Sequence, residues 1–144
     1  MPSKERQTAD AIVSAFNTMD VDTIIALRTP ECRRVFLPSS LKYPGQLNDA
    51  YRANLISMKS VFTSFDVTVT DVIEGTSQES GNKKIVMYIT ARGDTAIGKY
   101  NNEYVWKLGF EESGERVNEW SEYVDVVSSS PYMSLNDSMN ADNE

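Results

Sequence analysis

Residues 83–110 read KKIVMYITARGDTAIGKYNNEYVWKLGF, and this stretch decides the fold that the sequence predicts. Its first ten residues are rich in β-branched side chains, and its last ten alternate between apolar and polar side chains. Both patterns favour β-strands. The connecting segment, GDTAIGK, carries the glycines that are typical of a hairpin turn. We therefore predict an antiparallel hairpin here.

Two further segments with strand periodicity flank this hairpin. FDVTVTDVIEG, residues 65–75, and RVNEWSEYVDVV, residues 116–127, alternate with a period of two. The connections TSQESGN and EESGE contain the Gly, Ser and Asn residues that favour tight turns. The simplest topology is an antiparallel meander of four strands.

The N-terminal half has helical periodicity instead. Apolar side chains recur at spacings of three and four along residues 8–19, 21–27 and 48–62. The first helix is expected to begin near Thr8, and Asn48 and Asp49 are candidate caps for the third. CRRVFLP, residues 32–38, is a short strand or an extended segment. The sequence thus predicts an α+β fold, in which three helices cover one face of a curved sheet that forms a cone around a deep apolar pocket.

Length and composition favour one globular domain. The chain has 144 residues, 40% of them hydrophobic, and no apolar run approaches the roughly 20 residues of a membrane span. We assign residues 1–126 to the domain and residues 127–144 to a flexible acidic tail. The N-terminus lacks the features of a secretory signal, so a cytoplasmic location is expected. The net charge of −7 disfavours nucleic acid as a partner.

The residue inventory limits the possible chemistry. The sequence contains no histidine and a single cysteine, Cys32, which excludes a Cys/His zinc site and a Ser-His-Asp triad. Acid–base chemistry would have to use carboxylates, Tyr, Lys or Cys. Hard cations need several clustered oxygen ligands, and no such cluster can be assembled from the sequence. We expect neither a metal nor a cofactor, and we expect Cys32 to be a small buried hydrophobe.

Three blocks of sequence resemble a known family. They are LRTPECRRVFLPSSL, DTAIGKYNNEYVW and VNEWSEYVD, and the last belongs to a strand similar to the final strand of the SnoaL-like branch of the nuclear transport factor 2 fold. Together the blocks resemble the small isomerases of fungal meroterpenoid pathways, including the terretonin and austinol ring-rearranging enzymes. The resemblance spans residues 11–126.

This resemblance implies a function and an assembly. The expected activity is a cofactor-free isomerisation or cyclisation of a polycyclic terpenoid by carboxylates in an apolar pocket, with epoxide or lactone hydrolysis as the second choice. The fold family also implies a homodimer formed through the outer face of the sheet. A non-catalytic carrier or protein-binding module on the same fold is the alternative.

Glu122, Asp94 and Arg92 are the first catalytic candidates. Similarity to the limonene-epoxide-hydrolase branch implies that Arg92 and Asp94 end a pocket strand and face Glu122 across the sheet. Glu122 also shares strand parity with Trp120, so it points inward if Trp120 lies in the core. Arg92, Gly93 and Asp94 could instead form a turn with a surface ion pair. An adhesion role for this Arg-Gly-Asp tripeptide is disfavoured, because nothing marks the chain as secreted.

Glu103 is the fourth catalytic candidate. It lies opposite Tyr104 and Trp106 on its strand, and the sequence leaves open which of the two sets lines the pocket. Tyr104 and Trp120 are expected to form the apolar wall.

Four other residues are candidates for binding the substrate. Arg34 stands where the meroterpenoid isomerases tend to have histidine, and it could clamp a substrate carboxylate or carbonyl, hold a catalytic acid ionised, or simply be solvated. Tyr51, Met58 and Phe62 form a helical stripe that could line the cone, although such a stripe is more often plain core.

Overall fold

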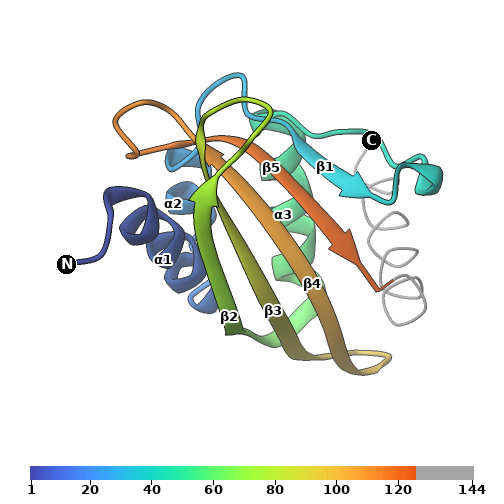
Figure 1. Ribbon diagram of the computed structural model, residues 1–144. Coiled ribbons are helices and arrows are strands. Elements are labelled where there is room, and N and C mark those ends of the chain that lie inside the picture. Colours follow the sequence, from blue (N-terminus) through green and yellow to red (C-terminus); the bar gives the residue numbers. More distant parts are fainter. Residues whose placement is uncertain (126–144) are drawn as a thin grey trace.

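The computed structural model describes residues 1–125, so the predicted tail and the predicted domain boundary at residue 126 lie outside the described residues. The elements follow one another along the chain as α1 (Lys4–Asn17), α2 (Val21–Ala26), β1 (Arg34–Leu37), the 3₁₀ turn η1 (Ser39–Leu41), α3 (Asn48–Val61), β2 (Phe62–Thr76), β3 (Lys83–Thr95), β4 (Gly98–Phe110) and β5 (Val117–Val124) (Figure 1).

The sheet has five strands in the order β1-β5-β4-β3-β2. The predicted meander is confirmed, since β2 to β5 pair antiparallel in chain order, and the central hairpin places Met87 opposite Trp106. The short segment before the third helix adds the fifth strand, because β1 pairs parallel with β5 and places Arg34 opposite Trp120. This pairing brings two distant parts of the chain together at the candidate site.

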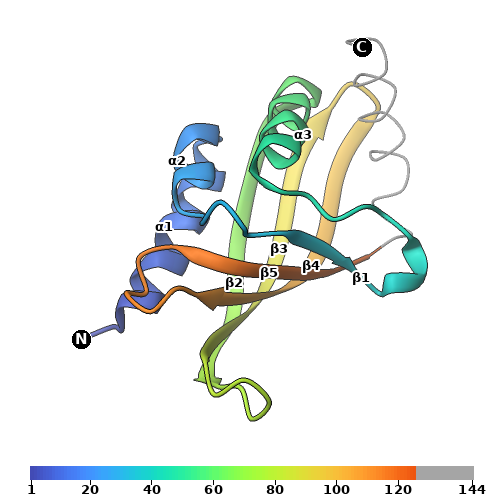
Figure 2. The ribbon, with the colours of Figure 1, turned by 90° about the horizontal axis from the view of Figure 1, so that it is seen from above.

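The sheet is strongly curved, and the three helices lie on one side of it (Figure 2). The core lies between these layers and is built from the apolar stripes of α1 and α3 and from the inward side chains of β3, β4 and β5, among them Ile12, Phe16, Leu55, Met87, Ile89, Trp106, Leu108 and Trp120. The predicted α+β fold is confirmed.

Two helix starts differ from the prediction. α1 begins at Lys4 rather than near Thr8, because the Ser3 side chain accepts a hydrogen bond from the backbone N–H of Arg6 and caps the helix before its apolar stripe begins. In α3, Asn48 is the first helical residue and not the cap. Its side-chain oxygen accepts from Arg28 Nε at 2.9 Å instead.

Gly93, the centre of the Arg-Gly-Asp tripeptide, lies within β3 where the neighbouring strand β2 comes very close. A Cβ atom at this position would lie 2.4 Å from the backbone oxygen of Ser64 and 2.8 Å from the ring of Phe62. Both contacts are far shorter than van der Waals separation. The glycine is therefore explained by strand packing, and the tripeptide is part of a strand rather than a turn.

Gly93→Ala should lower the free energy of unfolding by about 1–3 kcal/mol, because overpacking against backbone cannot be relieved by rotating a side chain. Urea unfolding followed by circular dichroism measures this. Gly75→Ala is the matched control, since a Cβ there meets no atom within 4 Å. Equal stability of the two variants would contradict the close approach of β2.

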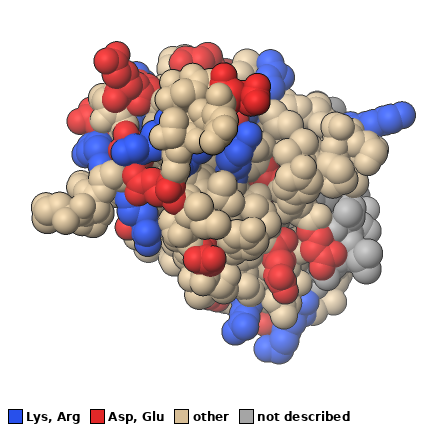
Figure 3. All heavy atoms as spheres, in the orientation of Figure 1, with Lys and Arg blue, Asp and Glu red and all other residues tan. Residues whose placement is uncertain are grey.

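The outer face of the sheet carries a row of exposed or partly exposed apolar side chains. Tyr88 pairs with Val105, and Val105 pairs with Tyr123 on the next strand. Tyr88 and Tyr123 are 43% and 54% exposed. Acidic and basic side chains are interspersed on the face seen in Figure 3. A homodimer through the outer face stays a prediction.

Within residues 1–125, no helix has the length and apolar character needed to cross a membrane.

Candidate active site at Arg34 and Glu122

A buried ion pair joins the two strands that meet in parallel. Glu122 on β5 lies opposite Phe36 on β1, and its side chain points into the interior, where the residue is 1% exposed. Arg34, 8% exposed, donates from Nε to Glu122 Oε1 at 2.6 Å. The prediction that Glu122 shares the inward face with Trp120 is confirmed, since Trp120 is fully buried.

Arg34 is held by several further contacts. Its Nη1 donates to Gln46 Oε1 at 3.0 Å and to Asn54 Oδ1 at 3.4 Å, and its backbone exchanges hydrogen bonds with Gln46. The guanidinium also lies 4.5 Å from the centroid of the Tyr51 ring. Burial alone would lower the pKa of Arg34, but the Glu122 carboxylate and Tyr51 outweigh it and raise that pKa. Arg34 is thus a fixed, permanent cation rather than a solvated side chain.

Each partner of this ion pair keeps one polar atom uncommitted. Within residues 1–125, neither Oε2 of Glu122 nor Nη2 of Arg34 takes part in a hydrogen bond. One acceptor and one donor group thus belong to the same buried pair. Such a pair can accept a proton from one atom of a bound molecule and stabilise negative charge on another.

The inward face of β4 adds two phenols beside this pair. The hydroxyl groups of Tyr100 and Tyr104 are hydrogen-bonded to each other, and Asn102 Nδ2 donates to the Tyr100 hydroxyl at 2.8 Å. Burial, the neighbouring phenol and the Glu122 charge raise the pKa of Tyr104 well above its ordinary value. Both phenols therefore keep their protons at neutral pH, and either hydroxyl can be the donor in the hydrogen bond between them.

Tyr51 and Trp120 form the apolar side of the site. Tyr51 is 1% exposed, and its ring packs edge-on against Trp120 with 5.7 Å between centroids. Burial raises the pKa of Tyr51, so it too stays protonated. Met58 and Phe62 are partly buried against the core, and Phe62 packs on Tyr100 at 5.1 Å. Of the predicted binding residues, Arg34, Tyr51 and Trp120 thus meet directly.

The expected convergence of Arg92 and Asp94 with Glu122 is wrong. Ile89 and Ala91 fill the interior face of β3, so the period of two places Arg92 and Asp94 on its exposed outer face. The side chain of Asp94 accepts a hydrogen bond from the Ser64 hydroxyl at 2.8 Å and lies 3.7 Å from Lys99 Nζ. Of the alternative, a turn with a surface ion pair, the turn is wrong because the tripeptide lies within β3, whereas Asp94 does form a surface ion pair, with Lys99 rather than Arg92.

Glu103 also lies on the outer face. Asn102, Tyr104 and Trp106 take the inward positions of β4, so the question that the sequence left open is decided against Glu103. Its backbone N–H, and not its carboxylate, contacts the site, by donating to Asn102 Oδ1 at 2.8 Å.

Five residues of the site were missed by the sequence prediction: Arg28, Gln46, Asn54, Tyr100 and Asn102. Tyr100 and Asn102 share strand parity with Tyr104, and Asn54 follows Tyr51 at helical spacing, so the periodicity contained a signal for these three. No local pattern marks Arg28 or Gln46. They reach the site through the tertiary arrangement of the segments before and after β1.

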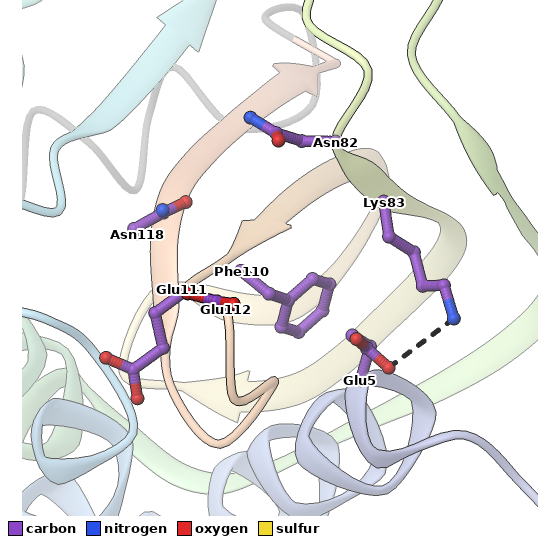
Figure 4. Close-up of a pocket in the computed structure, with 7 residues that line it drawn as sticks. All are labelled: Glu5, Asn82, Lys83, Phe110, Glu111, Glu112 and Asn118. Carbon is purple, nitrogen blue, oxygen red and sulfur yellow. Dashed lines mark ion pairs between the residues drawn. The ribbon is translucent and has the colours of Figure 1, made fainter.

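A hollow of about 370 Å³ lies elsewhere, where the start of β5, the end of β4 and the start of α1 meet. It is lined by Glu5, Asn82, Lys83, Phe110, Glu111, Glu112 and Asn118, and the ring of Phe110 lies between these polar side chains (Figure 4). Lys83 Nζ and Glu5 Oε2 are 3.7 Å apart at one side. None of the predicted site residues lines this hollow.

Cys32 and possible metal ligands add no further chemistry to the site. Burial raises the pKa of the Cys32 thiol to about 11, so at neutral pH it is a buried thiol rather than a nucleophile. Within residues 1–125, no three Cys, Asp or Glu side chains gather into a group that could hold a metal ion. A reaction without a metal stays a prediction.

Comparison with known proteins identifies the family. No family model matches the chain. It is 28% identical over 127 residues, 86% of each chain, to austinoid biosynthesis cluster protein H of Aspergillus calidoustus. Protein J of the same organism is 32% identical over 121 residues, which cover 83% of this chain and 72% of protein J. The chain belongs to the family of the austinoid biosynthesis cluster proteins. The predicted resemblance to the SnoaL-like isomerases of fungal meroterpenoid pathways is confirmed.

Solved structures agree with this family assignment. The structure of AusH from Aspergillus nidulans superposes with a TM-score of 0.74 at 27% identity and covers 87% of both chains. One curated relative has a different kind of name: AacuP of Aspergillus aculeatus, a monooxygenase by name, is 29% identical over 83% of this chain. The family is therefore one of fungal secondary metabolism, and of the relatives named here, AacuP alone has a name that states a reaction.

Proposed function

We propose that this protein is a cofactor-free isomerase or cyclase that rearranges a polycyclic terpenoid intermediate by proton transfer. The observation that carries the proposal is the buried pair of Arg34 and Glu122, which retains one uncommitted acceptor and one uncommitted donor group and lies beside two protonated phenols. The relatives in austinoid biosynthesis support the substrate class.

Each of three residues would have one role. Glu122 Oε2 removes a proton from a carbon next to a carbonyl group, and the Nη2 group of Arg34 stabilises the oxyanion that forms. Tyr104 lies two register positions from Glu122 on the adjacent strand, where diagonal neighbours are about 7–8 Å apart. With Tyr100 as the donor in the hydrogen bond between the two phenols, the Tyr104 hydroxyl donates a second hydrogen bond to the substrate. Glu122 then returns the proton at another atom, so the enzyme ends the cycle unchanged and the product is an isomer.

Oxygenation is the second candidate, and the name of the relative AacuP is what favours it. The two reactions differ in what they add to the substrate. An isomerase leaves the molecular mass unchanged and needs no oxygen, whereas a monooxygenase adds one oxygen atom, and a hydrolase adds the elements of water.

The test is to incubate the purified protein with ketone- and lactone-bearing meroterpenoid intermediates, with and without oxygen, and to analyse the products by mass spectrometry. We expect an isomeric product in both atmospheres. In heavy water, the product should gain deuterium at the carbon that Glu122 reprotonates, to the extent that the proton held by Glu122 exchanges with solvent before it is returned. A product heavier by one oxygen atom that forms in air alone would establish the monooxygenase instead.

A further inference from the structure

We propose that the substrate carries an anionic oxygen, such as a carboxylate, which binds beside the guanidinium of Arg34 and balances the charge of a second buried arginine, Arg28. This inference rests on the proposed function and narrows its substrate class. It follows from the charges and contacts of the interior cluster around Tyr51.

The cluster holds two guanidinium groups and one carboxylate. Arg28 is 2% exposed, and its guanidinium carbon lies 4.5 Å from the centroid of the Tyr51 ring, the same distance as that of Arg34. Among the ion pairs of residues 1–125, Arg34 is paired with Glu122, whereas Arg28 is paired with no carboxylate. With its phenols protonated, the cluster therefore has a net charge of +1.

The hydrogen bonds of Arg28 compensate this charge in part. Its Nε donates to Asn48 Oδ1 at 2.9 Å, and its Nη2 donates to the carbonyl oxygens of Cys32 and Gln46 at 2.8 and 3.0 Å. Its Nη1 is buried and has no hydrogen-bond partner among the described residues. These partners are neutral dipoles. They orient the guanidinium but do not cancel its charge, and an unbalanced charge is costly in an apolar interior.

Burial lowers the pKa of Arg28, and the positive charge of Arg34 acts in the same direction. A guanidinium nevertheless stays protonated in proteins, so the cluster cannot relieve its charge by losing a proton. An anion bound at Arg34 would balance the net positive charge of the cluster. Both guanidinium groups lie against the Tyr51 ring, so both attract an anion that binds beside Arg34. The donor for such an anion is one N–H of Arg34 Nη2, since Arg28 is enclosed, and the second N–H of Nη2 remains for the oxyanion of the proposed reaction.

The experiment uses two rigid tricyclic terpenoid probes, dehydroabietic acid and its neutral methyl ester. Binding is followed at neutral pH by the fluorescence of Trp106 and Trp120. Both are buried, and their ring centroids are 5.0 Å apart. We expect the acid to bind at least about tenfold more tightly than the ester, which corresponds to about 1.4 kcal/mol. Raising the salt concentration should change the preference little, because the site is buried.

Two variants test the contribution of Arg28. Arg28→Met keeps an apolar stem over Tyr51 but removes the charge, so it should weaken binding of the acid and leave binding of the ester unchanged. Arg28→Lys should retain the preference for the acid. If Arg28 had only a structural role, Arg28→Met would weaken the binding of the acid and of the ester equally. Arg33→Met is the matched control, since it removes an exposed arginine from the same segment.

The results separate this inference from the proposed function. If acid and ester bind equally well to the unaltered protein, the inference is overturned, while a terpenoid-binding isomerase remains supported. If neither probe binds, both the inference and the terpenoid substrate class fail. Should Arg28→Met not fold, the comparison of acid with ester in the unaltered protein and in Arg28→Lys still decides the matter.

Discussion

Glu122→Gln should lower turnover of the native substrate by about a hundredfold or more while the protein stays folded, because an amide cannot exchange the proton that a general base must carry. The amide oxygen can still accept the hydrogen bond that Arg34 Nε now donates to Oε1. The shape of the site is therefore kept and its acid–base function is lost. Turnover is measured by product formation, and folding by circular dichroism.

Glu119→Gln is the matched control for this experiment. Glu119 lies on the same strand, but its carboxylate contacts Lys84 and Lys107, and its side chain is 42% exposed. Its replacement should leave turnover unchanged. If Glu122→Gln itself keeps turnover within about threefold of the original, which is far below the usual effect of losing a general base, the proton transfer is carried by another group. Tyr104→Phe would then be the next variant to measure.

The fold was predictable because the periodicity of each segment matches its final environment. Apolar and polar side chains alternate along β4 and β5, which predicted strands there, but in β4 the alternation left open which face is inside. The parallel pairing of β1 with β5 could not be predicted in this way. It joins residues 34 and 120 through tertiary packing, and four residues of β1 carry too little pattern to specify a partner.

The strand parity of a residue, where it was used, predicted correctly which side chain faces the interior. The positions inferred from family resemblance for Arg92 and Asp94 were wrong. Glu122 was placed correctly because it shares strand parity with Trp120, which is buried. Arg92 and Asp94 were misplaced because a family position was given more weight than the parity of Ala91, which puts both on the outer face. Arg34 was predicted as a site residue, but its ion pair with Glu122 was not predicted. That ion pair depends on the parallel pairing of two strands that are far apart in sequence, and no local pattern encodes it.

Arg34→Met should lower the free energy of unfolding by about 3–5 kcal/mol, because it removes the ion-pair partner of the buried Glu122 carboxylate, and the remaining cation of the cluster, Arg28, forms no ion pair with that carboxylate. The desolvation cost of that carboxylate remains, while the attraction and the hydrogen bond at 2.6 Å are lost. Chemical denaturation with urea measures the change. Arg33→Met, next to it on the exposed side, should change stability by no more than about 0.5 kcal/mol, as surface substitutions do.

The double variant Arg34→Met with Glu122→Gln separates the ion pair from the packing. Removing both charges removes the uncompensated carboxylate, so the double variant should be more stable than Arg34→Met alone, although it has lost one more native side chain. The two substitutions should be non-additive by about 0.5–3 kcal/mol, as expected for residues in direct contact. Additive losses would mean that Arg34 and Glu122 stabilise the fold independently. The pair would then not be the charged unit on which the proposed proton transfer depends, and Glu122 would have to act without Arg34 as its partner.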